Sequence, residues 1–191
     1  YRTLGRTGLK VSLLGFGTGG PRKFGQDSDV TFEQQKSLVH HCLDQGINLF
    51  DTAQGYGDSE LLLGRTLEGV ARERYVLSSK WDHTEWKSPS GTGKPDGPIW
   101  EDPEKVAEGV ESSLQRLATD HLDIFHVHGV LPEHSAVVAD RFGPVITRLK
   151  EQGKIRFLSL SERFISDPKH EGCVAGMRRD PELWDIIMLK Y

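Results

Sequence analysis

Short apolar segments alternate with segments of helical periodicity along the chain. Six of the apolar segments are expected to be strands, at residues 10–18, 47–53, 75–81, 121–130, 154–162 and 185–191. Between them, apolar positions recur at helical spacing in residues 31–46, 58–69, 102–119, 135–153 and 167–184. The pattern therefore predicts strands and helices in alternation.

Residues at the helix ends support this assignment. Thr31 and Gln34 have the spacing of a capping box, in which each side chain bonds to the backbone N–H of the other. The segment 135–153 contains Gly143 followed by Pro144, and a proline inside a helix removes one backbone hydrogen bond. A break or kink is therefore expected at that point.

The predicted strands are mostly apolar rather than alternating between apolar and polar residues. Such strands belong to a parallel sheet covered by helices, which is either an open doubly wound sheet or a (β/α)8 barrel. In a barrel, functional groups gather where the strands end. Small or polar residues recur at these ends, namely Gly17, Thr18, Asp51, Lys80, His128 and Ser161. The sequence therefore favours an α/β fold of the (β/α)8 barrel (TIM-barrel) type, preceded by an N-terminal hairpin.

Six strands do not close an eight-stranded barrel. Two further βα units would need about 80–100 residues, given a typical barrel of about 250 or more. We therefore expect residues 1–191 to form a single barrel domain that is truncated at its C-terminal end and contains strands 1–6 only.

Composition and charge are those of an ordinary globular protein. The chain has 191 residues, of which 36% are hydrophobic and 27% charged, and a formal net charge of −4. Basic and acidic residues are interspersed, which argues against a nucleic-acid partner. No apolar run suits a membrane span, and the N-terminus does not resemble a signal peptide. Cys42 and Cys173 are far apart, so two reduced thiols in a cytoplasmic protein are expected.

Four side chains form a set suited to protonating a carbonyl oxygen. Asp51 ends one strand, Tyr56 follows on a glycine-flanked turn, and Lys80 and His128 end the next two strands. A nearby ammonium lowers a tyrosine pKa by favouring the phenolate, and a carboxylate can hold that ammonium in place. An imidazole can orient the substrate oxygen. Carbonyl reduction also needs a hydride, which must come from a nicotinamide because side chains do not supply one.

These residues and their surroundings resemble the aldo-keto reductase family. The resemblance rests on GRTGLKVSLLGFGT, GINLFDTAQGYGDSELLLGRTL, YVLSSKW, LDIFHVHGV and GKIRFLSLSE. In that family Asp-x4-Tyr follows the second strand, a lysine ends the third and a histidine ends the fourth. The resemblance implies that Tyr56 is the general acid and that Lys80 modulates its pKa. It also implies that Asp51 orients the lysine and that His128 positions the carbonyl group.

The resemblance further implies a small carbonyl substrate and NADPH or NADP+ as cofactor, with NADH left open. It places the cofactor beside Gly17, Thr18, Asp51, Ser161, Glu162 and Met188. Glu162 and Met188 stand where many members have Asn and Gln. A carboxylate accepts hydrogen bonds but does not donate them as an amide does, so the way the nicotinamide carboxamide is held is open.

The substrate pocket is expected to involve Tyr56, His128 and Trp81. Trp86 and Trp100, in a segment rich in Gly and Pro, are candidates for an aromatic wall around it. A surface loop with partly buried tryptophans is an equally good interpretation of that segment.

Two other patterns allow different interpretations. The glycines of GFGTGG match the dinucleotide fingerprint G-x-G-x-x-G, but that motif needs a helix opening directly from the loop, and the next helix begins near Thr31. His126 and His128 share one face of a strand and would suit a metal. A metal site would need further ligands at other strand ends, so no metal is expected and His126 is interpreted as a core histidine.

The sequence thus predicts an NADP(H)-dependent oxidoreductase that reduces aldehydes or ketones to alcohols. A catalytically silent or truncated relative, which keeps the four residues without turnover, is the alternative. A metal-dependent barrel hydrolase is a remote one. The substrate and the oligomeric state are left open.

Overall fold

The computed structural model describes residues 1–81, 102–162, 165 and 167–190. Its strands are β1 (Arg2–Thr3), β2 (Lys10–Val11), β3 (Gly15–Gly17), β4 (Leu49–Asp51), β5 (Val76–Trp81), β6 (Leu122–Val130), β7 (Ile155–Glu162) and β8 (Ile186–Met188). Its α-helices are α1 (Phe32–Asp44), α2 (Ser59–Thr66), α4 (Glu104–Leu117), α5 (Ser135–Val137), α6 (Gly143–Glu151) and α7 (Glu171–Arg179).

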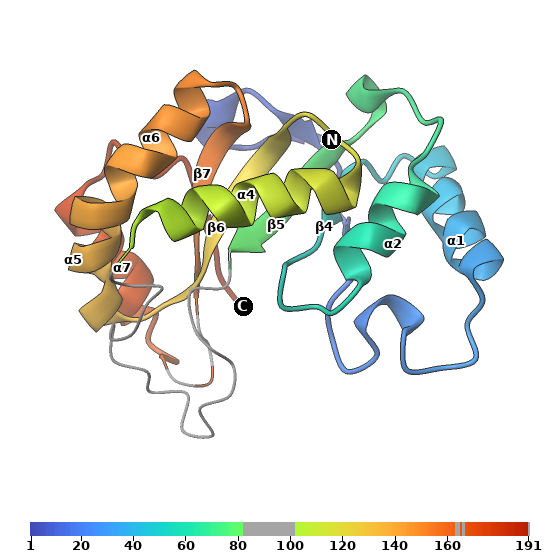
Figure 1. Cartoon of the computed structure of the whole chain (residues 1–191), viewed down its shortest axis with the longest axis horizontal. Coiled ribbons are helices and arrows are strands. Elements are labelled where there is room, and N and C mark those ends of the chain that lie inside the picture. Colours follow the sequence, from blue (N-terminus) through green and yellow to red (C-terminus); the bar gives the residue numbers. More distant parts are fainter. Residues whose placement is uncertain (82–101, 163–164, 166, 191) are drawn as a thin grey trace.

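The six strands from β3 to β8 form one sheet in sequence order, and every neighbouring pair is parallel. The helices lie over one face of this sheet, with α4 crossing in front of it in Figure 1. β1 and β2 form a separate antiparallel hairpin. The prediction of a half-barrel sheet with an N-terminal hairpin is confirmed.

The helix-end predictions are also confirmed. Thr31 caps α1, accepting from the Gln34 backbone N–H at 3.3 Å, and the Gln34 side chain accepts from the Thr31 N–H at 2.8 Å. The segment around Gly143 is broken by a π-helical turn at Val138–Phe142, after which α6 begins with Pro144 in its first turn.

The expectation of one continuous strand over residues 10–18 is wrong. Only Lys10–Val11 and Gly15–Gly17 are strands, and they belong to different sheets. The intervening Ser12 leaves the sheet to exchange hydrogen bonds with Asn48, and Leu13 is 75% exposed. The chain turns between the two strands, because Leu9 and Val11 of the hairpin segment pack against Val76 and Ile124 at the amino ends of the sheet.

The two faces of the sheet have different cores. The outer face packs on the helices through a large apolar cluster that includes Phe50, Phe125 and Trp184. The inner face carries a smaller cluster at the amino ends of the strands, made of Leu9, Val11, Val76 and Ile124 with Leu4, Leu49, Phe157 and Ile186 packed against it. Since side chains alternate along a strand, this apolar layer determines which residues further along each strand also face inward.

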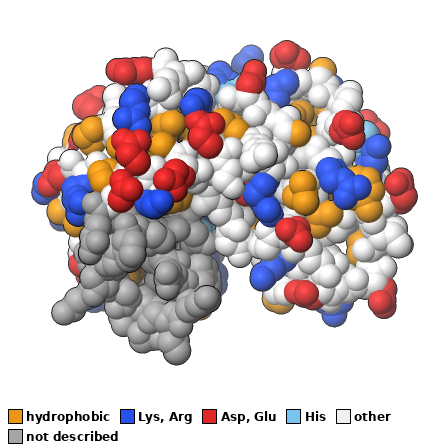
Figure 2. All heavy atoms as spheres, in the orientation of Figure 1, with side chains coloured by type: hydrophobic (Ala, Val, Ile, Leu, Met, Phe, Trp, Pro, Cys, Tyr) orange, Lys and Arg blue, Asp and Glu red, His pale blue; other side chains and the backbone are white. Residues whose placement is uncertain are grey.

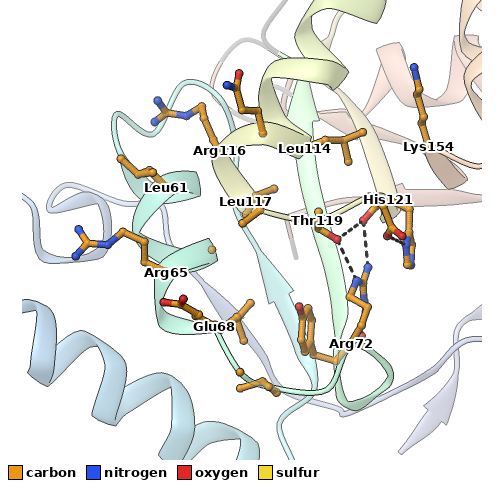
Figure 3. A pocket seen from close by; sticks show the side chains of 18 of the residues that line it. Leu61, Arg65, Glu68, Arg72, Leu114, Arg116, Leu117, Thr119, His121 and Lys154 are labelled. Carbon is orange, nitrogen blue, oxygen red and sulfur yellow. Dashed lines mark hydrogen bonds and ion pairs between the residues drawn. The ribbon is translucent and has the colours of Figure 1, made fainter.

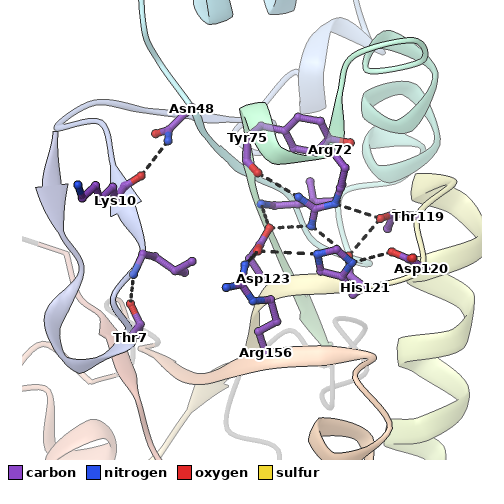
Figure 4. A network of polar contacts seen from close by, with 12 residues as sticks. Thr7, Lys10, Asn48, Arg72, Tyr75, Thr119, Asp120, His121, Asp123 and Arg156 are labelled. Carbon is purple, nitrogen blue, oxygen red and sulfur yellow. Dashed lines mark hydrogen bonds and ion pairs between the residues drawn. The ribbon is translucent and has the colours of Figure 1, made fainter.

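A buried carboxylate ties three strands together at their amino ends (Figure 4). Asp123 at the start of β6 is 1% exposed and lies 2.7 Å from the Arg72 guanidinium and 2.5 Å from that of Arg156 on β7. It also accepts from the backbone N–H of Leu77 on β5 at 2.9 Å. These contacts fix the register of β5, β6 and β7 below the polar part of the barrel.

Replacing this carboxylate tests its contribution to stability. Asp123→Asn should lower the free energy of unfolding by about 3 kcal/mol, because two guanidinium groups lose their buried anionic partner. Urea unfolding followed by circular dichroism measures the change. Asp140→Asn, at an exposed ion pair with Arg179, is the matched control and should leave the midpoint unchanged. Equal effects of the two substitutions would contradict this account of Asp123.

Candidate functional site

Above its apolar layer, the inner face of the sheet becomes polar toward the carboxyl ends of the strands. The inward residues there are Asp51 on β4, Ser78 and Lys80 on β5, His126 and His128 on β6, and Ser159 and Ser161 on β7. Such a layer at the carboxyl ends of parallel strands is where barrel enzymes hold their functional groups.

The centre of this layer is an ion pair between neighbouring strands. Lys80, 2% exposed, contacts Asp51 Oδ2 through its Nζ and donates to the carbonyl of Thr52 at 2.8 Å. A buried ammonium is tolerable only when an anion and hydrogen-bond acceptors replace its hydration shell. Asp51 and Thr52 supply both, so the lysine is held in a single place.

Tyr56 lies over this ion pair. Lys80 Nζ is 5.1 Å from the centroid of the Tyr56 ring, and the His128 ring meets the Tyr56 ring edge to face at 5.9 Å between centroids. Gly19 lies against the ring, since a Cβ there would be 2.8 Å from a Tyr56 ring carbon. The structure therefore brings together Asp51, Tyr56, Lys80 and His128, which the sequence predicted as a set.

The turn that carries Tyr56 is held on two sides. The amide of Gln26 donates to the Tyr56 carbonyl at 3.0 Å and accepts from the Asp58 N–H at 2.8 Å. Gly57 has φ +63°, and a Cβ on it would lie 2.5 Å from the Gln26 amide oxygen. On the other side Arg116 of α4 donates to the Gly57 carbonyl at 2.6 Å. The hydrogen bonds from Gln26 and Arg116 together restrict the orientation of the Tyr56 phenol.

A second polar contact lies below the ion pair. Ser78 Oγ is 2.9 Å from Asp51 Oδ1 and 2.8 Å from His126 Nε2. Burial, the Lys80 ammonium and the His128 ring hold the pKa of His126 well below its ordinary value of 6.5, so the ring is neutral at pH 7. His126 is buried, as the interpretation of a core histidine requires, but its Nδ1 has no hydrogen-bond partner among the described residues.

Four of the residues expected around the cofactor lie in or beside this layer. Gly17 pairs with Asp51 in the sheet, and the backbone N–H of buried Thr18 donates to the Asp51 carbonyl at 2.9 Å. Ser161 is buried at the end of β7, where its Oγ accepts from the backbone N–H of Gly129 at 3.4 Å. Met188 pairs with Ser161 at the end of β8.

Two residues expected at the site lie elsewhere. Glu162 is one residue out of phase with Ser161, and its carboxylate contacts His170 at the start of α7 and the Lys190 backbone N–H. Trp81 is one residue out of phase with Lys80, and its ring packs 5.1 Å from that of Phe142 in the outer core. Alternation along the strand turns both side chains away from the inner face. Trp86 and Trp100 lie outside the described residues.

Sequence reasoning missed two contributors. Ser78 is two residues before Lys80, so the period of two along a strand could have placed both on one face. Gln26 follows a 3-10 turn (Lys23–Gly25) in an irregular segment, where no periodicity indicates which backbone groups its amide reaches.

Other parts of the described surface do not compete with this site. A groove of about 1250 Å³ lies outside the barrel between α2 and α4 (Figure 3), lined by charges of both signs such as Arg65, Glu68 and Lys154. Its lining contains none of the four clustered residues. Within the described residues, no group of three or more His, Cys, Asp or Glu side chains could hold a metal ion.

The outer surface also offers no field of one sign on the face drawn in Figure 2, where acidic and basic side chains are interspersed. Among the described residues, no helix has both the length and the apolar character needed to cross a membrane.

Comparison with known proteins gives a consistent result. The Aldo/keto reductase family profile matches residues 13–167. A probable aldo-keto reductase 1 from Glycine max is 33% identical over 162 residues, which cover 83% of this chain and 44% of that protein. The NADH-specific methylglyoxal reductase of Escherichia coli is 35% identical over 202 aligned positions, covering 98% of this chain and 57% of the relative.

A putative aldo-keto reductase from Pseudomonas aeruginosa is similar in structure. Its TM-score is 0.71 at 32% identity, and the match covers 95% of this chain and 64% of the solved chain. The chain spans about half the length of the curated relatives it matches.

The neutral His126 predicts a pH dependence of stability. Below pH 6.5 the unfolded chain binds a proton here that the folded chain does not. Stability should therefore fall as the pH decreases, by up to about 1.4 kcal/mol per pH unit from this residue. Urea unfolding between pH 7 and pH 5 measures the slope. His126→Gln should make the slope shallower, and exposed His41→Gln should not. Equal slopes in all three proteins would disprove the assignment.

Proposed function

This chain belongs to the aldo/keto reductase family, and we propose that it reduces aldehydes or ketones to alcohols with a nicotinamide cofactor, Tyr56 giving the proton. The observation that carries the proposal is the cluster of Tyr56, Lys80, Asp51 and His128. Isolated members of such a set are common in proteins. Their convergence on the inner face, at the carboxyl ends of three strands, is typical of a barrel active site.

In the proposed mechanism, the proton moves from the Tyr56 hydroxyl to the substrate oxygen. Loss of the proton leaves a phenolate, and the Lys80 ammonium 5.1 Å from the ring centroid stabilises that negative charge. Asp51 keeps the ammonium in place, so no reorganisation is needed when the charge develops. For alcohol oxidation, the reverse direction, the phenolate would accept the proton.

In the same mechanism, His128 positions the carbonyl group beside Tyr56. Its ring lies edge to face with the phenol, so a substrate oxygen in front of both rings can meet both polar groups. Two hydrogen-bonding groups aimed at one oxygen both fix its position and stabilise the charge it gains. We therefore assign the substrate pocket to Tyr56 and His128 and leave Trp81 out of it.

The residues around the mouth fit a nicotinamide cofactor. Among the described residues, no heavy atom beyond the adjacent residues lies within 4 Å of the point where a Cβ on Gly17 would be, which leaves room there beside the polar layer. Asp51 and Ser161 belong to that layer, Thr18 lies beside Asp51, and Met188 lies next to Ser161. Glu162 is turned away and is not included. The cofactor supplies the hydride, and we propose NADP(H), with NADH as the alternative to be tested because one relative is named NADH-specific. We further propose that residues 1–191 belong to one barrel domain.

The proposal is tested by following cofactor absorbance during reduction of 4-nitrobenzaldehyde with NADPH and, separately, NADH. Tyr56→Phe should lower kcat by about 10²–10⁴-fold, because it removes the proton donor. Tyr75→Phe is the matched control, since this half-buried tyrosine packs against Phe50 on the outer face. It should leave kcat unchanged.

Two results would contradict the proposal. Turnover by Tyr56→Phe at the wild-type rate would remove the phenol from the mechanism. Cofactor binding by the wild type, seen as a change in tryptophan fluorescence, without any turnover would favour the catalytically silent alternative.

A further inference from the structure

His126 is a buried titratable group that the proposed mechanism does not use. It is 1% exposed and lies below the site on β6, next to the Lys80-bearing strand β5. Its Nε2 is 2.8 Å from Ser78 Oγ, which is in turn 2.9 Å from Asp51 Oδ1. The other oxygen of Asp51 contacts Lys80. The four side chains thus form one continuous hydrogen-bonded chain across three strands.

The direction of each hydrogen bond in this chain follows from its members. The Asp51 carboxylate, paired with an ammonium, only accepts, so the Ser78 hydroxyl donates its proton to Oδ1. The Ser78 oxygen is then available only as an acceptor for His126. His126 must therefore carry its proton on Nε2 and leave Nδ1 as an acceptor.

The opposite tautomer would be costly. A proton on Nδ1 would make Nε2 an acceptor and draw the Ser78 proton away from Asp51. It would also bury an N–H group, because Nδ1 is buried and has no hydrogen-bond partner among the described residues. A bare acceptor in that position is less costly than a charged or donating group with no partner.

We propose that His126 and Ser78 are positioning residues that hold Asp51 Oδ1, so that Oδ2 remains on Lys80 and the ammonium remains below Tyr56. Asp51 needs such an anchor because it is the last residue of β4 and its side chain is 21% exposed. Thr18 fixes only its backbone carbonyl, and the terminal torsion of an aspartate is soft. This inference rests on the proposed reductase function.

This hydrogen-bonded arrangement requires a neutral His126. His126 Nε2 is 4.0 Å from Asp51 Oδ1, so an imidazolium would compete with Lys80 for the same carboxylate. Among the described residues, the charged or titratable groups facing the ring are Lys80 on β5, Asp51 on β4 and His128 on the same strand. Burial, the Lys80 ammonium and the His128 ring keep the pKa of His126 low, which protects the ion pair at neutral pH.

The test is a double-mutant cycle on the protein reducing 4-nitrobenzaldehyde with NADPH. Ser78→Ala and His126→Leu should each lower kcat about tenfold, the effect of losing one hydrogen bond, with the aldehyde KM within about twofold. The double variant should be no slower than Ser78→Ala, because without the serine the histidine no longer reaches Asp51. His126→Gln, which can still donate to Ser78, should stay within about twofold of wild type.

Three kinetic results would overturn the inference. These are an unchanged kcat in Ser78→Ala, a double variant whose loss is the product of the two single losses, and a His126→Gln variant as slow as His126→Leu. The pH profile provides a further check, since Ser78→Ala should shift the profile of kcat and a merely structural loss should not.

A spectroscopic arm separates this inference from the proposed function. If the wild type shows no turnover, the reductase proposal fails. ¹⁵N NMR of labelled histidine still tests the hydrogen bonds from His126 through Ser78 to Asp51. His126 should give the nitrogen shifts of the Nε2–H tautomer in the wild type, and Ser78→Ala should change them. An Nδ1–H tautomer in the wild type, or identical shifts in both proteins, would overturn the inference.

Discussion

The site depends on placing the Lys80 ammonium inside a barrel, at the base of a tyrosine ring. A charge with 2% exposure is stable only with an anion and acceptors around it, and the sheet supplies these from adjacent strands. Asp51 comes from β4 and the lysine from β5, so the parallel register of the two strands determines whether they meet. Tyr56 lies above the pair on a turn that Gln26 and Arg116 hold in place.

The rest of the fold maintains this register from both ends. At the amino ends, Asp123 joins Arg72 and Arg156, and an apolar layer covered by the hairpin fills the barrel base. At the carboxyl ends, the inner face is polar, with Asp51, Lys80 and His126 among its residues. The contacts that stabilise the sheet and the candidate site thus lie at opposite ends of the same strands, as in other barrels.

Sequence reasoning predicted the elements whose signals are local. The capping box at Thr31 and the kink before Pro144 depend on neighbouring residues, and the matched family motifs indicated the four clustered residues. It was less successful where a shift of one position along a strand moves a side chain to the other face of the sheet. Trp81 and Glu162 each follow a correctly placed inward residue by one position, so alternation turns them outward. The role of Gln26 depends on an irregular loop meeting a distant turn, which no sequence period encodes.

In the proposed mechanism, Tyr56, supported by the Lys80 ammonium, protonates the carbonyl oxygen as hydride from the cofactor reaches the carbonyl carbon. The most direct measurement is transfer of deuterium from 4-deuterated NADPH to 4-nitrobenzaldehyde, with the alcohol analysed by mass spectrometry for wild type and Lys80→Met. We expect deuterium on the alcohol carbon with the wild type, and the labelled alcohol should form at least about 100-fold more slowly with the variant. Absence of label transfer by the wild type, or equal rates for the two proteins, would contradict the proposed mechanism.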